Sequence, residues 1–414
     1  MTPKRPHLDV IVIGAGPSGS ECAWRLARAG FEVLVAEEHL RAGEPVHCTG
    51  VISAQAYGAF DLPRSAIQGE LIAAELTSPG GIALHVPLNG SRAYTVDRRE
   101  VDLALAQRAN EAGARFCYDT RARGLAVDRA GVTVTGVRSG QPWRERARAV
   151  VLATGARSGL PRQVGLASAR EHAHGAQAEV PVASPATMRV WLGRRLAPGG
   201  FGWVVPGKPG WSRVGVLTAE RPRAALRKVA RRAFHRTGDR LSEADGSKLL
   251  SDGSGFCPTD GEITVHPIPS TPRHPTCGER VLSVGDAAGQ VKMTTGGGVY
   301  YGLLAAQLAS EVLAEGLARG RLGTSHLARY ERLWQEVLGP EQRAGQLLRR
   351  LVSAASDETL DEIFRGAERR GVSRYLLELV DFDWHARPAV GLMLAMLGAA
   401  PGGRGLKWLG KLLR

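Results

Sequence analysis

The chain has 414 residues, of which 43% are hydrophobic, and it carries a formal net charge of +14. This length exceeds what a single compact core supports, so we expect two or three packed subdomains. No window approaches the roughly 20 consecutive apolar residues of a membrane-spanning helix, and the five cysteines are scattered, without a Cys-x-x-Cys pair. These features argue against an integral membrane protein, a disulfide framework and a zinc site.

The positive charge reflects 54 basic against 40 acidic side chains, and arginine supplies most of the excess. Such a chain meets nucleic acid, anionic lipid or phosphorylated ligands, unless the arginine content is only a compositional bias. The sequence contains no zinc finger, helix-turn-helix or aromatic-plus-basic RNA-binding motif, so we expect no nucleic-acid partner. Residues 1–9 are largely polar and resemble no secretory signal, which favours a cytoplasmic location.

The first forty residues predict a βαβ unit that binds a dinucleotide. Its strand, helix and second strand are expected at residues 8–13, 20–29 and 31–36. The turn before the helix reads Gly14-Ala-Gly16-Pro-Ser18-Gly19. Gly14 permits the sharp turn, Gly16 lets the backbone approach a pyrophosphate, and Gly19 lets helix and strand pack closely. The helix N-terminus, with Ser18 in its first turn, offers N–H groups to the phosphates.

Glu37 ends the second strand, where its carboxylate is placed to bind a ribose diol. This segment alone leaves NAD and FAD open. A second glycine-rich segment favours FAD, because a strand ends at Gly285-Asp286 and a helix from about residue 299 to 317 follows Thr295-Gly-Gly297-Gly298. Asp286 is placed to hold the ribityl hydroxyls, and the amides of Gly297 and Gly298 to stabilise negative charge on the reduced flavin.

The remaining chain predicts a discontinuous FAD domain with an inserted substrate domain. We expect the FAD domain at residues 1–60, 90–170 and 275–320, and the substrate domain at 60–90 and 170–275. Strands at 82–86, 187–192 and 213–217 indicate that the insert is mainly antiparallel. Residues 320–414 are expected to be largely helical, with breaks at Gly339-Pro340 and at 381–388. The predicted class is therefore α/β, with a Rossmann-like FAD domain, a β insert and a helical C-terminus.

Five motifs in this order resemble the geranylgeranyl reductase family, within the p-hydroxybenzoate hydroxylase-like superfamily. Besides the first glycine-rich turn, they are Glu44-Pro-Val-His-Cys-Thr-Gly50, Val96-Asp-Arg-Arg-Glu-Val-Asp102, Ala197-Pro-Gly-Gly-Phe-Gly-Trp-Val-Val-Pro206, and the stretch from Gly285 to Leu304. The resemblance spans residues 8 to about 340. It implies the superfamily's FAD-binding fold, with an active site under the flavin.

The resemblance also implies roles for individual residues. Cys48 would contact the flavin and act chemically, whereas the alternative is a small side chain that packs a tight loop. Phe201 and Trp203 would wall the substrate cavity, unless they only pack the strand. His47 is expected at the surface or behind the site. The cofactor-binding set implied by both lines of reasoning is Gly14, Gly16, Ser18, Gly19, Glu37, Cys48, Thr49, Arg98, Ala122, Gly285, Asp286, Gly297, Gly298 and Val299.

Three positions depart from the family pattern. Met293 replaces a proline beside the flavin, and Phe201 replaces a tyrosine. Thr154 stands where hydroxylases carry an aspartate that helps handle FAD and NADPH. The absence of that carboxylate argues against direct use of NADPH in the hydroxylase manner.

The implied activity is FAD-dependent reduction of prenyl double bonds in a lipid, quinone or diphosphate. The reductant would be NADPH or ferredoxin, the latter an electron-donor protein. One alternative is an FAD-dependent monooxygenase of an apolar or aromatic substrate. Another is a non-catalytic basic flavoprotein that binds membrane or nucleic acid.

The C-terminus offers one possible membrane contact. In residues 404–414, leucines at 406, 409, 412 and 413 share a predicted helical face, with basic residues and Trp408 beside them. This pattern is typical of an interfacial helix, which would place the protein peripherally on the cytoplasmic membrane face. A tail helix packed on its own protein is the alternative.

Overall fold

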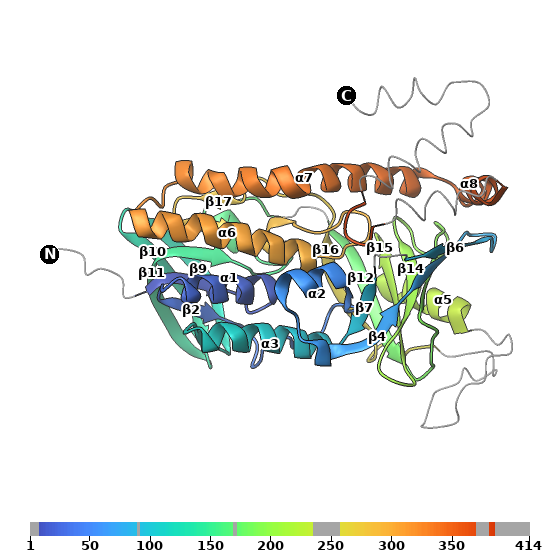
Figure 1. The fold of residues 1–414 in the computed structure, drawn as a ribbon, viewed down its shortest axis with the longest axis horizontal. Helices are drawn as coiled ribbons and strands as arrows, with labels where there is room; N and C mark the ends of the chain where they lie inside the picture. The colour runs from blue at the N-terminus through green and yellow to red at the C-terminus, as the bar shows by residue number, and fades with distance from the viewer. Residues whose placement is uncertain (1–7, 89–91, 169–171, 235–256, 370–380, 386–414) are drawn as a thin grey trace, which may run out of the picture.

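The computed structural model describes residues 8–88, 92–168, 172–234, 257–369 and 381–385. Their strands form three sheets of eight, seven and three strands, and helices cover them (Figure 1). The predicted C-terminal interfacial helix lies outside the described residues. Within them, no helix combines the length and apolarity that a bilayer crossing requires.

The eight-stranded sheet contains the N-terminal dinucleotide unit. Strand order is β17-β18-β11-β1-β2-β8, with the β9–β10 hairpin attached to β11. Strand β1 pairs in parallel with β2 and β11, and five of its six residues are buried, as expected of an apolar run in a central strand. The bounds are β1 Leu8–Ile13, β2 Val33–Ala36, β8 Arg115–Cys117, β9 Thr120–Asp128, β10 Gly131–Arg138, β11 Gln141–Leu152, β17 Cys277–Gly278 and β18 Val281–Ser283.

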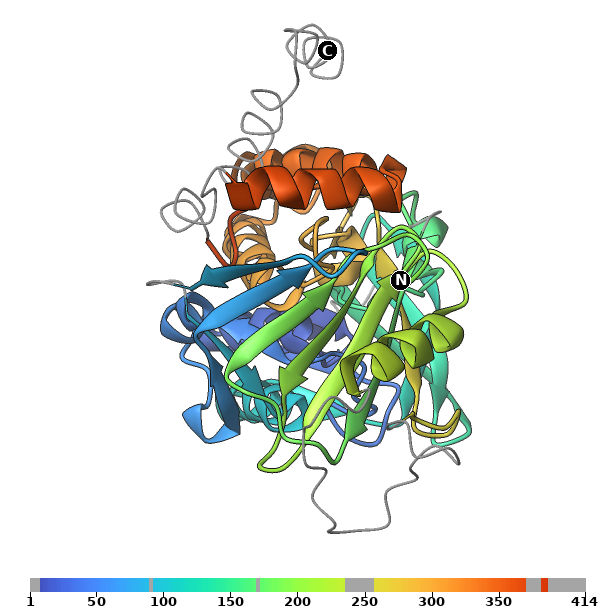
Figure 2. The same ribbon diagram turned by 90° about the vertical axis from the view of Figure 1, so that its right-hand side faces the viewer.

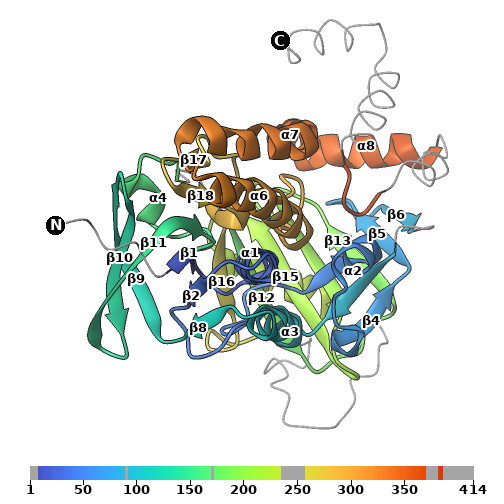
Figure 3. The same cartoon turned by 60° about the vertical axis from the view of Figure 1, so that its left-hand side comes forward.

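Three helices pack along one face of this sheet, with α1 in contact with both α3 and α6 (Figure 3). Their apolar residues and those of the sheet form the largest core. Short elements connect these helices to the strands. The bounds are α1 Pro17–Arg28, α2 Ala54–Phe60, η1 Arg64–Ala66, α3 Arg98–Glu111, α4 Leu160–Gln163, η2 Gly285–Ala288 and α6 Val299–Arg319.

The seven-stranded sheet has the order β16-β12-β15-β14-β13-β5-β6 and is antiparallel except between β13 and β5. Helix α5 covers one of its faces, where Leu226 and Val229 join Val214 and Val216 in a second core. Figure 2 shows α5 against this sheet. The bounds are β5 Ala73–Thr77, β6 Ala83–Pro87, β12 His172–Val180, β13 Thr187–Trp191, β14 Phe201–Pro206, β15 Ser212–Thr218, α5 Pro222–Phe234 and β16 Thr264–Pro269.

The strands expected at 82–86, 187–192 and 213–217 correspond to β6, β13 and β15. The α/β class with a mainly antiparallel second sheet is thus confirmed. The proposed domain boundaries remain a prediction. A small third sheet, in the order β3-β7-β4, contains β3 Val51–Ser53, β4 Ile67–Leu71 and β7 Ala93–Val96.

Helix α7, Thr324–Ala354, corrects one expectation. It continues through Pro340, where we expected a break. Tertiary contacts explain the difference, since the Gln342 amide donates to Gly289 O at 2.7 Å and Gly345 packs against Met293 and Thr294. These contacts offset the backbone hydrogen bond that proline removes. Helix α7 therefore runs from above α6 to the second sheet, where α8, Asp357–Arg369, follows (Figure 1).

Candidate active site

A cavity of about 1430 Å³ is lined by residues of both large sheets and of α7. Ligand pockets usually measure roughly 300–1,000 Å³, so this one has room for a dinucleotide and a second molecule. Of the predicted site residues, only Gly19 does not line it. The residues that do are Gly14, Gly16, Ser18, Glu37, Cys48, Thr49, Arg98, Ala122, Phe201, Trp203, Gly285, Asp286, Gly297, Gly298 and Val299.

The glycines of the first turn have different structural roles. A Cβ at Gly14 would lie 2.3 Å from Ala153 O, and the residue has φ of +106°. A Cβ at Gly19 would lie 1.9 Å from Gly14 O. A Cβ at Gly16, by contrast, would meet no protein atom within 4 Å, although this residue lines the cavity. Gly14 and Gly19 thus serve packing, whereas Gly16 leaves an open cradle before helix α1.

Glu37 lies at the end of β2 and is buried. One carboxylate oxygen accepts a hydrogen bond from Ala15 N at 2.7 Å, and the other accepts one from His39 N at 3.0 Å. These bonds fix the carboxylate beside the first turn. His39 Nδ1 also lies 2.6 Å from the second oxygen, so the oxygen that faces Ala15 N is the one with a lone pair left for a ribose hydroxyl.

The second glycine-rich segment meets the first through Ser18. A Cβ at Gly285 would lie 2.6 Å from Ser18 Oγ, and one at Gly302 would lie 2.3 Å from it. Glycine at both positions therefore lets the start of α1 pack against η2 and α6. Asp286 projects into the same cavity, and burial raises its pKa, although Arg273 and Arg98 oppose this effect.

Helix α6 begins at Val299, and Gly298 precedes it without a side-chain cap. Its first N–H groups consequently remain available beside the cavity. Thr295 Oγ1 accepts a long hydrogen bond of 3.4 Å from Gly297 N. The segment offers backbone donors and positive partial charge to an anionic ring.

Cys48 lies on the loop before β3, and its sulfur accepts a hydrogen bond from Gly50 N at 3.4 Å. The sulfur also interacts with Arg98, at the start of α3. Arg98 binds Asp102 through contacts of 2.8 to 3.1 Å. Burial lowers the pKa of Arg98, but Asp102 and Cys48 outweigh burial and raise it overall. Arg98 is therefore a buried cation that joins the cysteine loop to α3.

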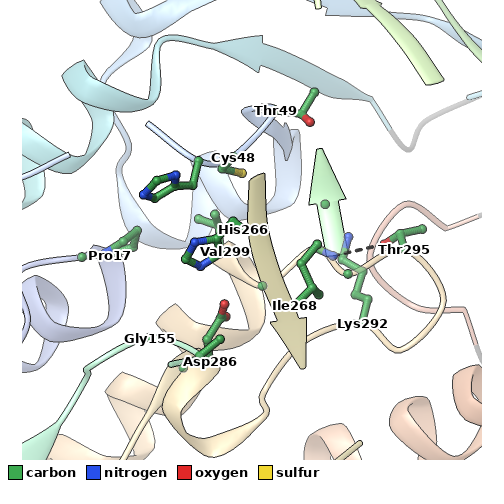
Figure 4. A pocket seen from close by; sticks show the side chains of 18 of the residues that line it. Pro17, Cys48, Thr49, Gly155, His266, Ile268, Asp286, Lys292, Thr295 and Val299 are labelled. Atoms are coloured by element: carbon green, nitrogen blue, oxygen red, sulfur yellow. Dashed lines mark hydrogen bonds between the residues drawn. The ribbon is translucent and has the colours of Figure 1, made fainter. Parts of the chain in front are cut away.

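Two histidines lie beside Cys48: His47 is exposed, as expected, and His266 was not anticipated from the sequence. His47 lines the cavity and stacks on His266 of β16, with ring centroids 4.6 Å apart. Burial, with His47 and Arg157 nearby, lowers the pKa of His266 to about 4. His266 is thus neutral at pH 7. It belongs to no recognisable motif, so only the pairing of β16 with β12 brings it here. Figure 4 shows Cys48, His266 and Asp286 around the same pocket.

The part of the cavity next to the second sheet is apolar. Trp203 of β14 projects over Gly215 of β15, where a Cβ would lie only 2.1 Å from the indole ring. Phe201 and Trp203 have ring centroids 5.5 Å apart. The apolar lining comprises Leu76, Val86, Leu88, Met188, Val190, Leu192, Phe201, Trp203, Leu217, Ile268, Leu348, Val352 and Phe382.

A short segment at 381–385 contacts the loop between η2 and α6 and the first turn of α6. Lys292 Nζ lies 2.7 Å from an Asp383 carboxylate oxygen, and both side chains are buried. The same Nζ donates to Phe382 O at 2.9 Å. The Tyr301 hydroxyl donates to Asp383 O at 2.9 Å. These contacts fix one wall of the cavity beside Gly297.

The donor set fits FAD. One open glycine cradle lies at a helix N-terminus, a carboxylate stands at the end of the neighbouring strand, and a second helix N-terminus, which packs against the first, also lines the cavity. Phosphate-, ribose- and ring-binding groups that line one cavity suit a dinucleotide. The apolar part next to the second sheet remains for another ligand.

Comparisons with known proteins agree with this arrangement. Residues 8–184 match the family of pyridine nucleotide-disulphide oxidoreductases. A digeranylgeranylglycerophospholipid reductase of Methanopyrus kandleri is 32% identical over 381 residues, covering 89% of this chain and 92% of that protein.

Solved structures share the fold. A geranylgeranyl bacteriochlorophyll reductase-like protein from Thermoplasma acidophilum has a TM-score of 0.81 at 22% identity, over 98% of this chain and 99% of that one. Halogenase PltM, in complex with phloroglucinol and FAD, has a TM-score of 0.65 at 15% identity, over 98% and 95% of the chains. By its match to the curated reductase over nearly its whole length, this chain belongs to the geranylgeranyl reductase family of FAD-dependent oxidoreductases.

Proposed function

We propose that this protein is an FAD-dependent reductase that saturates isolated double bonds of a prenyl chain carried by a lipid, quinone or diphosphate. One observation carries the proposal. A single cavity combines two glycine-rich helix N-termini with a continuous apolar lining, and Cys48 lies among the residues that line it. The similarity to a reductase whose name specifies a digeranylgeranyl lipid supports the same substrate class.

When bound by these residues and reduced, FAD would supply the hydride that one alkene carbon needs. An isolated alkene has no carbonyl group to stabilise charge, so its second carbon needs a proton at the same time. We assign that proton to the Cys48 thiol, with Arg98 stabilising the sulfur as it loses the proton. Solvent then returns a proton to Cys48.

The apolar walls hold the alkene and exclude water. Phe201 and Trp203 contribute flat surfaces against which a prenyl chain can pack. Holding the alkene, cofactor and thiol in one geometry lowers the entropic part of the barrier. Contacts along the rest of the chain supply binding energy far from the reacting carbons.

We further propose that each predicted cofactor residue keeps its role. The open turn at Gly16 would hold the pyrophosphate, Glu37 the ribose, and Asp286 the ribityl hydroxyls. The amides of Gly297 and Gly298 would lie against the pyrimidine ring of the flavin.

The electron donor and the contact with membranes are further parts of this proposal. NADPH and reduced ferredoxin are the two candidate donors, and anaerobic reduction of the flavin by each alone distinguishes them. The Thr154 hydroxyl is buried without a hydrogen-bond partner in the described structure, and threonine offers no carboxylate for NADPH handling.

Liposome flotation of the full chain and of a chain ending near Pro401 tests peripheral binding to membranes. Equal binding by both chains would refute a role of the C-terminal segment.

Anaerobic reoxidation of the reduced holoenzyme tests the function. A geranylgeranyl lipid should speed reoxidation, as followed by the flavin absorbance. The same lipid with fully saturated chains is the matched control and should have no effect. Equal rates with both lipids, and with prenyl quinones and diphosphates, would refute the proposal.

A further inference from the structure

Arg349 is a charged side chain in the apolar part of the cavity. It lies in the last turns of α7. Figure 1 shows that this end of the helix lies near the second sheet. Leu348, Arg349 and Val352 all line the cavity from this helix. The surrounding walls are apolar, and a charged group among them is unfavourable unless it has a hydrogen-bonding or charged partner.

The guanidinium of Arg349 has few partners. Its Nη2 donates to Gly199 O at a long 3.4 Å. Its Nη1 is buried and finds no acceptor among the described residues. A guanidinium has five N–H donors, so most of its hydrogen-bonding capacity is unused.

No counterion among the described residues balances this charge. Burial lowers the pKa of Arg349, and no carboxylate opposes that effect. Asp381, which lines the same cavity, already accepts hydrogen bonds from Asp383 N and Trp384 N. Arg98, a buried arginine of the cavity, has Asp102 as a partner. Arg349 is half-buried, and its Nη1 is fully buried without an acceptor. A guanidinium in this position without a counterion is unfavourable by itself, which points to an anionic ligand.

The surroundings of Arg349 fit a phosphate. Ser353 lies one turn further along α7 and lines the same cavity, so the two side chains share a helix face. Gly199 and Gly200 line the cavity beside these two side chains and carry no side chain that would fill the space in front of them. Since the bond to Gly199 O is long, the guanidinium can turn its N–H groups toward an anion without losing a strong contact. Arginine matches the geometry of phosphate oxygens better than lysine does.

We propose that Arg349 forms a subsite for the phosphate group of the prenyl substrate, so that the protein prefers phosphate-bearing prenyl compounds to neutral ones. This inference rests on the proposed function and names its substrate class. The phosphate comes from a free diphosphate or from a phosphodiester lipid headgroup. Both present oxygens to the same guanidinium while the prenyl chain lies along the apolar walls.

Equilibrium binding to the oxidised holoenzyme tests the subsite without any turnover. The ligands are geranylgeranyl diphosphate, a digeranylgeranyl glycerophospholipid and geranylgeraniol, which carries a prenyl chain without phosphate. Arg349→Met should weaken phosphate-bearing ligands by about 10- to 100-fold, the range for a hydrogen bond to a charged group. It should change the affinity for geranylgeraniol by less than about twofold, because that ligand makes no charged contact. Arg350→Met, at the exposed neighbouring position, is the matched control and should change neither affinity.

The pattern of losses identifies the source of the phosphate. A loss confined to the diphosphate or to the phospholipid assigns the subsite to that compound, and a loss for both assigns it to the shared phosphate. Arg349→Lys keeps the charge and should restore part of the affinity. The same ratio of phosphate-bearing to phosphate-free binding in the parent and Arg349→Met would overturn the proposal.

Thermal unfolding separates a ligand-binding arginine from a structural one. Without substrate, Arg349→Met should unfold at the same temperature as the parent or higher, because it removes a half-buried charge that has no counterion among the described residues. A marked loss of stability without selective loss of phosphate-bearing ligands would show a structural role and overturn the proposal. If no prenyl compound is reduced although the selective binding loss occurs, the proposed function fails and the subsite stands. If a prenyl compound is reduced but Arg349→Met shows no selective loss of phosphate-bearing ligands, the proposed function stands and the subsite is refuted.

Discussion

A substitution at Gly16 should weaken cofactor binding without disturbing the packing of the protein, unlike a substitution at Gly14. Gly16 has φ of −68° and ψ of 179°, which alanine also adopts, and an added Cβ meets no protein atom within 4 Å. Gly14→Ala is the matched contrast, because its Cβ would meet Ala153 O at 2.3 Å with φ at +106°. The two substitutions add the same methyl group on the same loop.

The expected magnitudes follow from this difference. Without FAD, Gly16→Ala should leave the free energy of unfolding unchanged or raise it by about 0.4–1 kcal/mol, because alanine restricts the unfolded chain. If a pyrophosphate lies against Gly16, the methyl group overpacks that contact at a cost of about 1–3 kcal/mol. The FAD dissociation constant should then rise by about 5- to 150-fold. Gly14→Ala should instead destabilise the protein even without FAD.

Urea unfolding of the FAD-free protein and fluorescence titration with FAD measure both quantities. Normal stability with weakened FAD binding is the expected result for Gly16→Ala. Parent-like FAD affinity in this variant would refute a pyrophosphate at the turn. Loss of stability without FAD would refute the open cradle.

Three further predictions concern the rest of the site. Cys48→Ala and Cys48→Ser should retain FAD but lower alkene reduction by about 10²- to 10⁴-fold, as for a lost general acid; unchanged rates in both would remove its chemical role. Folding lowers the pKa of His266 from 6.5 to about 4, so it favours the neutral imidazole. The free energy of unfolding should therefore contain the full contribution of His266 above pH 6.5 and should fall as the pH drops toward 4. At about 1.36 kcal/mol per pH unit, this loss is at most about 3 kcal/mol, and His266→Gln should reduce it in urea titrations; an identical pH profile would contradict the assignment. Asp383→Ala leaves Lys292 buried and unpaired, so the free energy of unfolding should fall by about 3–5 kcal/mol; a loss below about 1 kcal/mol would contradict the pair's importance.

The elements with local signals were predictable from the sequence. The apolar run at Leu8–Ile13, the glycines after it and the strand-to-helix order correspond to β1, α1 and β2. The strand β15 was predictable from its alternation of Val214 and Val216 with residues of the opposite face. These patterns involve residues close together in the sequence, so they predict the elements without knowledge of the rest of the fold.

The residues that depend on distant pairing were not predictable. His266 approaches His47 only because β16 pairs with β12 at the edge of the second sheet. Pro340 suggested a break by local chemistry, but the long-range bond from Gln342 to Gly289 supports a continuous helix. Arg349 belongs to no sequence motif, and only the structure shows that its Nη1 is buried without an acceptor among the described residues.

Product mass after anaerobic turnover tests the central claim most directly. Dithionite-reduced holoenzyme is incubated with a geranylgeranyl phospholipid, and the recovered lipid is weighed by mass spectrometry. A reductase of isolated prenyl bonds predicts a gain of two hydrogens for each saturated bond, with no oxygen incorporated. An unchanged mass with every prenyl lipid, quinone and diphosphate, or a gain of oxygen when air is admitted, would contradict it.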